Sequence, residues 1–220
     1  MSAPMSPFAL PRLTTAEQLQ RGDALLTNAL GRRSCRFFSD RPVPRAVIEK
    51  ALAVAHTAPS GANRRGWRFV VVDDHDLKRR IREAAEAEER ESYERRMTDD
   101  WRAALAPIGT DWQKPFLETV PYLVVMFQLN SQVVDGRMQR NYYPTESIGL
   151  AAGFFLMACQ QMGLATLTHT PSPMNFLRDI LQRPSNEKPF LLIPVGYPAD
   201  DCVVPDIPKK PLDEVLQWNV

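Results

Sequence analysis

Residues 145–163, TESIGLAAGFFLMACQQMG, constrain the fold of this chain more than any other stretch. They read as one helix with apolar residues on nearly every side. A helix that is apolar all round has to be covered by protein on all sides. We therefore expect it to lie buried at the centre of the fold, with other elements packed around it.

Four apolar runs predict strands, and helical patterns lie between and before them. The strands are expected over residues 68–74, 121–128, 165–169 and 189–198. Further helices are expected over 15–30, 44–55, 77–97 and 176–181, the first of them starting at a capping box of Thr14 and Glu17. This order of elements predicts an α/β fold, in which a mixed sheet is layered with helices.

Length and charge exclude several classes of protein. A chain of 220 residues with 44% hydrophobic content suits a single domain spanning residues 1–220. Lys and Arg total 27 against 26 for Asp and Glu, so the whole chain has no strong field for nucleic acid or an anionic membrane. Because no apolar run reaches the roughly 20 residues of a membrane span, and no signal peptide is evident, we expect a cytoplasmic protein.

The cysteines and histidines argue against a metal site. Cys35, Cys159 and Cys202 are odd in number and widely spaced, without a CxxC pair, and the chain has only three histidines. This pattern suggests neither a disulfide framework nor a zinc site. We expect no bound metal, so difficult chemistry would need an organic cofactor.

The stretch GRRSCRFFSD, residues 31–40, gathers Arg32, Arg33 and Arg36 around Ser34. Guanidinium groups match phosphate oxygens in pairs, so this cluster could bind a terminal phosphate. A solvated basic turn with ordinary surface ion pairs accounts for the spacing equally well. Phe37 and Phe38, which follow, are expected in the core.

The stretch APSGANRRGW contains a tight turn at Ser60 and Gly61. Backbone amides in such a turn can approach a ligand closely. Most turns of this kind only reverse the chain, and that alternative stays open.

Together, RRSCRFFSDRPVP and APSGANRRGWRFVVV resemble the opening of the FMN-dependent nitroreductase family, and the similarity continues through most of the chain. The resemblance implies a mainly antiparallel α+β sheet sandwiched by helices. It also implies an intertwined homodimer with FMN at the subunit interface. Terminal extensions, about 1–13 and 197–220, would wrap the partner subunit, in keeping with the proline-rich C-terminal segment.

By the same resemblance, most of the cofactor site can be assigned. The predicted FMN-binding residues are Arg32, Arg33, Ser34, Cys35, Arg36, Ser60, Gly61, Thr168, His169, Thr170 and Lys209. Thr170 corresponds to a threonine that hydrogen-bonds flavin N5, although a cap on a helix starting near Pro173 is an alternative. His169 stands where a threonine is more usual, and we expect a satisfied strand-end histidine. Lys209 stands where relatives place an arginine, which keeps the charge but loses the bidentate fork.

A second constellation lies in the middle of the chain. Glu89 and Tyr93 are four residues apart, so on a helix they share one face, and Lys114 follows across a loop. A carboxylate, a phenol and an ammonium could bind an amino acid zwitterion. The run of acids Glu83, Glu86, Glu88 and Glu91 favours a solvated helix face instead, with Tyr93 in packing and Lys114 exposed.

This middle part resembles the iodotyrosine deiodinase branch of the family. The resemblance implies that Glu89, Tyr93 and Lys114 hold the substrate and close a lid, and that the backbone of Ala62 contacts the phenolate. It further implies reductive dehalogenation of 3-halotyrosines to tyrosine and halide, with a reductase or NAD(P)H as electron donor. The alternatives are a general NAD(P)H-dependent nitroreductase or quinone reductase, and a binding protein without turnover.

Overall fold

The computed structural model describes residues 4–219, and the chain divides into two compact units between Arg32 and Arg33. The N-terminal unit contains helix α1 (Thr15–Leu30), all of which is at least partly exposed. The predicted capping box is confirmed, because the Glu17 N–H donates to Thr14 Oγ1 at 3.3 Å and the Thr14 N–H donates to the Glu17 carboxylate at 2.8 Å. Local hydrogen bonds therefore fix the start of this helix.

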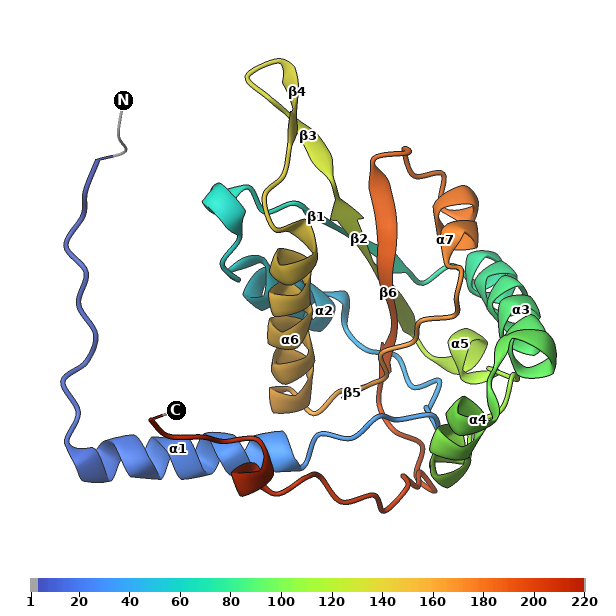
Figure 1. Ribbon diagram of the computed structural model, residues 1–220, viewed down its shortest axis with the longest axis horizontal. Coiled ribbons are helices and arrows are strands. Elements are labelled where there is room, and N and C mark those ends of the chain that lie inside the picture. Colours follow the sequence, from blue (N-terminus) through green and yellow to red (C-terminus); the bar gives the residue numbers. More distant parts are fainter. Residues whose placement is uncertain (1–3, 220) are drawn as a thin grey trace. The chain divides into compact units, whose positions relative to one another are not determined.

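The second unit is built on a four-stranded sheet in the order β1-β2-β6-β5 (Figure 1). Its strands are β1 (Trp67–Val72), β2 (Tyr122–Leu129), β6 (Glu187–Gly196) and β5 (Ala165–Thr166). All neighbouring strands pair antiparallel, which confirms the mainly antiparallel sheet. Strand β5 is shorter than expected, because the chain leaves the ladder after Thr166 and pairs again only at His169, opposite Leu192.

Strand β2 is buried on both faces of the sheet. Val124 and Met126 belong to one hydrophobic cluster, whereas Leu123, Val125 and Phe127 belong to the other. Alternate side chains of a strand point to opposite faces. A central strand covered on both sides therefore reads as one continuous apolar run.

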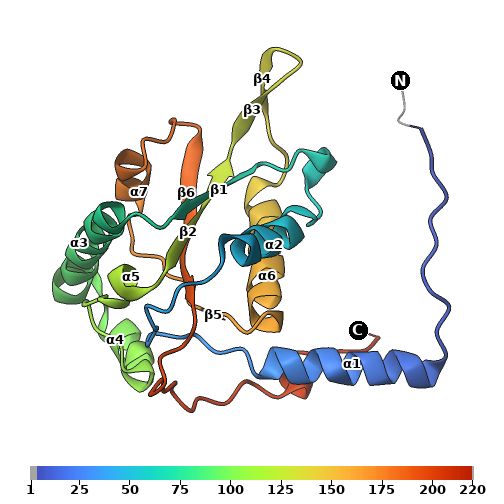
Figure 2. The same cartoon turned by 180° about the vertical axis from the view of Figure 1, so that it is seen from behind.

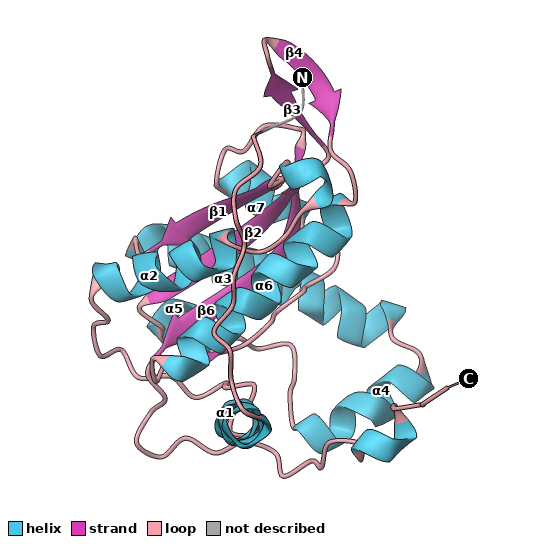
Figure 3. Cartoon of the chain, turned by 90° about the vertical axis from the view of Figure 1, so that its left-hand side faces the viewer, coloured by secondary structure: helices cyan, strands magenta, loops and turns pink. Residues whose placement is uncertain are grey.

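Helices cover both faces, which confirms the predicted sandwich. Helices α2 (Arg45–His56) and α6 (Pro144–Gln161) pack on one face, as Figure 3 shows. Helices α3 (His75–Glu91), α5 (Phe116–Thr119) and α7 (Asn175–Ile180) pack on the other. The predicted ranges of the four longer helices and of α7 agree with these bounds to within a few residues, apart from the C-terminal end of α3.

Helix α6 meets the expectation of a buried central helix on one side only. Ile148, Ala151 and Phe155 are fully buried against the sheet and α2. On the opposite side Leu150 is 47% exposed and Phe154 is 40% exposed in the single chain. One apolar face of α6 is thus left uncovered.

Several elements were not expected from the sequence. A hairpin of β3 (Ser131–Val134) and β4 (Arg137–Arg140) projects beyond the sheet (Figure 2). Its turn, Asp135 and Gly136, has φ values of 50° and 74°. Such Asp-Gly pairs favour the two-residue hairpin turn, so the signal was present in the sequence.

The charged helix also differs in detail from the single long helix expected over 77–97. Helix α3 ends at Glu91, a π-helical segment (Ser92–Arg96) continues it, and α4 (Asp99–Leu105) follows after a cap by Thr98. Short 3₁₀ turns occur at Gly61–Asn63, Ala106–Ile108 and Leu212–Glu214. Within residues 4–219, no helix combines the length and the apolar character that crossing a bilayer requires.

Candidate functional site

A cavity of about 210 Å³ lies between the end of α3, the segment before α5 and the residues that follow β5. It brings together predicted site residues from all three regions of the sequence. They are Arg36, Glu89, Tyr93, Lys114, Thr168, His169 and Thr170. Met97, Trp101 and Leu105, on and before α4, add apolar side chains to the wall.

Lys114 is the most deeply buried charged residue of this cavity, with 3% of its surface exposed. Its Nζ lies 3.8 Å from Glu89 Oε2, donates to Thr110 Oγ1 at 3.4 Å, and also donates to the Asp111 carbonyl. Burial lowers the pKa of Lys114 and raises the pKa of Glu89, while the two charges oppose these shifts. The interpretations of Lys114 as an exposed charge and of Glu89 as part of a solvated face are therefore wrong.

Tyr93 lies in the π-helical segment, where it faces the same cavity as Glu89. Its hydroxyl donates a hydrogen bond to the Thr110 carbonyl at 2.9 Å, and the Lys114 Nζ lies 5.9 Å from the centre of its ring. Burial, followed by the nearby charges of Glu89 and Asp111, raises the pKa of Tyr93. The phenol therefore stays protonated near neutral pH and acts as a hydrogen-bond donor.

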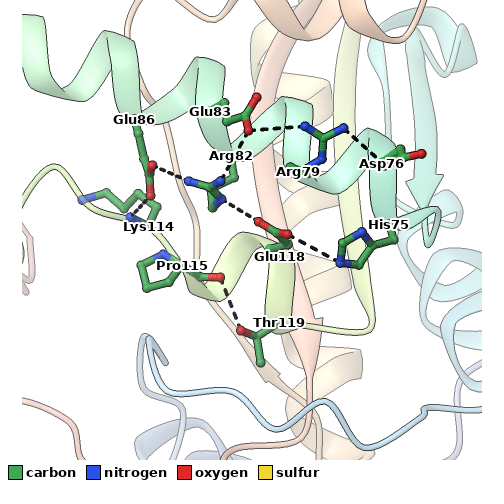
Figure 4. A network of polar contacts seen from close by, with 10 residues as sticks. All are labelled: His75, Asp76, Arg79, Arg82, Glu83, Glu86, Lys114, Pro115, Glu118 and Thr119. Carbon is green, nitrogen blue, oxygen red and sulfur yellow. Dashed lines mark hydrogen bonds and ion pairs between the residues drawn. The ribbon is translucent and has the colours of Figure 1, made fainter.

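A network on α3 and α5 fixes the backbone of Lys114 (Figure 4). Glu86 accepts the Lys114 N–H at 2.7 Å through one carboxylate oxygen and an Arg82 N–H at 2.6 Å through the other. Arg82 in turn donates to Glu118 at 2.7 Å. The run of acids predicts a solvated side chain for Glu86, and its two hydrogen bonds, with Lys114 and Arg82, correct that prediction. Its spacing of four from Arg82 was the available signal of a fixed position.

His169 is buried, and backbone hydrogen bonds to Leu192 hold it in place. The His169 N–H donates to the Leu192 carbonyl at 2.9 Å, and the Leu192 N–H donates to the His169 carbonyl at 3.0 Å. Burial, with the charges of Lys114 and Arg36, lowers its pKa to about 3, so the ring is neutral at physiological pH. Within residues 4–219 its buried Nε2 has no hydrogen-bond partner. The expectation of a fully satisfied histidine is therefore wrong for the side chain.

Thr168 and Thr170 flank this histidine and are exposed. Helix α7 starts at Asn175, and its first turn receives no side-chain cap hydrogen bond. The structure thus gives no support to Thr170 as a helix cap.

The arginine stretch lies partly at this cavity and partly beside a second one of about 480 Å³. Arg36 lines both cavities, whereas Ser34 lines only the second, together with Phe37 and Val203. The guanidinium of Arg33 donates to the Pro205 carbonyl. Arg32 is the last residue of the N-terminal unit.

The residues next to these arginines differ in burial. The Cys35 side chain is buried, so only its backbone could face a cofactor, and its N–H already donates to the Thr166 carbonyl at 3.0 Å. Phe38 is in the core, as expected. The expectation for Phe37 is wrong, because half of its surface is exposed in the single chain.

The turn at Ser60, Gly61 and Ala62 lines neither of these two cavities. The Gly61 N–H donates to Ser147 Oγ at 3.3 Å, and a Cβ at Gly61 would lie 2.3 Å from the Tyr142 carbonyl oxygen. Close packing against the start of α6 therefore requires glycine here. Lys209 also lines neither cavity and lies exposed in the C-terminal segment.

Comparison with known proteins identifies the family. A family model described as the nitroreductase family matches residues 29–197. A protein of Haliscomenobacter hydrossis named iodotyrosine deiodinase is 52% identical over 205 residues, covering 93% of this chain and 92% of that protein. The iodotyrosine deiodinase of Danio rerio is 41% identical over 217 residues, covering 97% of this chain and 73% of the relative.

Solved structures agree with this result. The crystal structure of oxidized iodotyrosine deiodinase bound to FMN and 3-iodo-L-tyrosine superposes with a TM-score of 0.80 at 31% identity, covering 89% of this chain and 99% of the other. A nitroreductase with bound FMN from Bacteroides fragilis has a TM-score of 0.63 at 18% identity, covering 84% and 94%, and shows the shared fold alone. The chain therefore belongs to the nitroreductase family, and relatives that are 41% and 52% identical to it are named iodotyrosine deiodinase.

Proposed function

We propose that the chain is an FMN-dependent reductive dehalogenase that converts 3-halotyrosines into tyrosine and halide. The observation that carries the proposal is the gathering of Glu89, Tyr93 and Lys114 in one cavity beside Thr168 and Thr170. The names of the relatives, and the iodotyrosine and FMN bound in the similar crystal structure, support the same reading.

The charged residues suit the amino acid end of the substrate. The Glu89 carboxylate would accept the substrate ammonium, and the Lys114 ammonium would bind the substrate carboxylate. In the structure these two side chains pair with each other, so a zwitterion would exchange one ion pair for two. The hydrogen bonds from Lys114 to Thr110 and Asp111 offset part of the cost of burying its charge, which a buried ion pair needs in order to be favourable.

The residues around the cavity also fit FMN. Arg33, Ser34 and Arg36 supply guanidinium and hydroxyl donors for a phosphate and a polar ring. Further polar groups are the exposed hydroxyls of Thr168 and Thr170 and the Nε2 of His169, which has no hydrogen-bond partner in the described part of the chain. Bound FMN would supply the electrons for the removal of halide.

The chain itself contributes position and exclusion of water. A substrate held at its charged end by Glu89, Tyr93 and Lys114 loses its freedom of orientation, which lowers the barrier to reaction. The apolar side chains of Met97, Trp101 and Leu105 would close over the ring and keep water out. Thr170 is proposed to hold a hydrogen bond at flavin N5.

The proposal includes an intertwined homodimer. The predicted ligand contacts Ser60, Gly61 and Ala62 line neither of the two cavities described above, so a second copy would supply them. The uncovered face of α6, with Leu150 and Phe154, gives that copy an apolar surface to bury. Exposed apolar residues of the C-terminal segment, among them Trp218 at 79%, fit an extension that wraps the partner.

The electron donor is proposed to be NAD(P)H or a separate reductase.

The proposed location is the cytoplasm. The three free cysteines fit a cytoplasmic protein, because disulfides are rare in that compartment.

The purified, FMN-loaded protein provides the test. Its visible flavin spectrum should respond to 3-iodotyrosine at low ligand concentration. The dithionite-reduced protein, mixed anaerobically with 3-iodotyrosine, should become oxidised and release iodide and tyrosine. A general nitroreductase would bind FMN without responding to iodotyrosine, and a binding protein without turnover would keep its flavin reduced and release no iodide.

A further inference from the structure

Two segments that are far apart in the sequence run side by side in opposite directions near the second cavity. The Ser39 N–H donates to the Tyr197 carbonyl, and the Ala199 N–H donates to the Phe37 carbonyl, each at 3.0 Å. Further along, the Arg33 guanidinium donates to the Pro205 carbonyl. Residues 33–39 and 197–205 are thus joined at both ends of their shared path.

Between these attachments the two segments bring two thiols into contact. A turn closed by the Cys202 N–H and the Ala199 carbonyl, at 3.0 Å, places Cys202 opposite Cys35. The two Sγ atoms lie 3.6 Å apart, although the residues are separated by 167 positions. A disulfide bond is about 2.05 Å long, so a shift of roughly 1.5 Å would close it. The third thiol, Cys159, is buried in the cluster on the other face of the sheet.

We propose that Cys35 and Cys202 form a reversible redox site that closes into an intrachain disulfide when the protein meets a peroxide. In the first step, one thiol is oxidised by hydrogen peroxide to a sulfenic acid and one water is released. In the second step, the other sulfur attacks the sulfenic sulfur, the S–S bond forms, and a second water leaves. Two thiols and one peroxide thus give one disulfide and two waters.

The surroundings of the two sulfurs set the order of the steps. Cys202 is half-buried, whereas only 3% of Cys35 is exposed. Burial also raises the pKa of Cys35 to about 12, which leaves little of its reactive thiolate. Peroxide therefore reacts at Cys202 first, and Cys35 is the resolving thiol, helped by the contact that already exists between the two sulfurs.

Closing the bond would fix the C-terminal segment to the arginine stretch. Ser34 and Arg36, which flank Cys35, and Val203 to Pro205, which follow Cys202, line the same cavity. If FMN binds at these arginines, a consequence that rests on the proposed function, the oxidised protein should release FMN more slowly than the reduced protein. Disulfide formation itself needs neither flavin nor halotyrosine, so the two claims can fail separately.

The test uses the full chain, reduced first and then treated with hydrogen peroxide. Titration of thiols under denaturing conditions should show a fall from three free thiols to one. The intact mass should drop by two hydrogens, a digest should join the peptides of Cys35 and Cys202, and dithiothreitol should reverse each change. Retention of all three thiols, or cross-links between chains in place of this one, would overturn the proposal.

Variants separate this pair from the remaining thiol. Cys159→Ser should still form the cross-link and should lose every free thiol. Cys202→Ser, at a half-buried position, should form no disulfide within the chain, and Cys35→Ser should behave in the same way if it folds. Conversion of Cys202 to a sulfinic acid in the wild type, with Cys35 still free, would contradict the assignment.

Discussion

The ammonium nitrogen of Lys114 lies 3.8 Å from a carboxylate oxygen of Glu89, and the two side chains are only 4% and 16% exposed. Residues 25 positions apart in the sequence are thus held as opposite charges in one small cavity. Burial raises the pKa of Glu89 and lowers the pKa of Lys114, and the opposite charge of the partner counteracts both shifts. A zwitterionic ligand can satisfy both groups at once.

Removing either charge should abolish tight binding of halotyrosine. Lys114→Ala and Glu89→Ala each leave one buried charge without its partner. Breaking a buried ion pair in this way lowers the free energy of unfolding by about 3–5 kcal/mol. We expect the affinity for 3-iodotyrosine to fall by at least about 100-fold, as measured by flavin absorbance during titration. FMN content should not change. Lys50→Ala, at an exposed position of α2, is the matched control. Undiminished binding by both site variants would refute the substrate assignment and leave the flavin assignment in place.

Glu86 should act as a positioning residue for Lys114. Loss of its carboxylate in Glu86→Ala frees the Lys114 N–H and removes one of the partners of Arg82, so the affinity for 3-iodotyrosine should fall by about tenfold. Glu86→Gln keeps an acceptor for the N–H and should retain most of the affinity.

The control for Glu86 lies one turn away on the same helix. Glu83 pairs with Arg79 and Arg82 but is 52% exposed, so Glu83→Ala should bind 3-iodotyrosine as the wild type does. Equal losses in the Glu83 and Glu86 variants would mean that the charge of the helix matters and the hydrogen bond to Lys114 does not.

His169 should make the fold sensitive to acid. Its pKa is about 3 in the folded chain and about 6.5 when unfolded, so between these values the unfolded state binds the extra proton. The free energy of unfolding should therefore decrease as pH falls below about 6.5, with no contribution above that pH. Urea unfolding at a series of pH values should show a shallower decrease for His169→Gln.

The slope of the wild type is the comparison for this pH effect. A His169→Gln variant with that same slope would show that the buried imidazole takes up a proton in the folded state.

The uncovered face of α6 should hold two copies together. Phe154→Glu and Leu150→Glu place a charge where each apolar side chain would gain about 1.5–3 kcal/mol on burial. Sedimentation should show a dimer for the wild type and a monomer for these variants. Val133→Glu, on the projecting hairpin and 64% exposed, should remain dimeric. A wild type that sediments as a monomer would remove this part of the proposal.

Much of the fold could be predicted because its signals are local. The capping box of Thr14 and Glu17, the apolar runs of β2 and β6, and the periodicity of α2 each define an element without reference to distant residues. The hairpin at Asp135 and Gly136 had a local signal too, but its strands lack the apolar alternation that marks a half-buried strand. They project from the sheet, so nothing in the chain selects for that pattern.

The residues that would contact the ligand could be predicted from the sequence, whereas the residues that hold them in position mostly could not. Glu89, Tyr93 and Lys114 stand out because their groups complement a zwitterion, and a family resemblance singles them out. Glu86 and Thr110 act through their positions: one binds the Lys114 backbone and the other accepts the Tyr93 hydroxyl. Such contacts arise from the path of the loop before α5, and no sequence pattern specifies that path. The exposure of Phe37 depends in the same way on tertiary packing.

Because β2 is buried on both faces, its pattern of polar and apolar residues does not determine its register against the neighbouring strands. A slip by one residue would exchange Val124 and Met126 with their neighbours, and apolar side chains would still face both layers. The register has to be set near the two ends of β2. Lys78 Nζ donates a hydrogen bond to the Val120 carbonyl at 2.8 Å, and the Thr145 hydroxyl donates to the Gln128 side chain at 3.1 Å. These two hydrogen bonds therefore set the register of the sheet. A chain that lost both could pair its central strand in a shifted register and still bury a hydrophobic core.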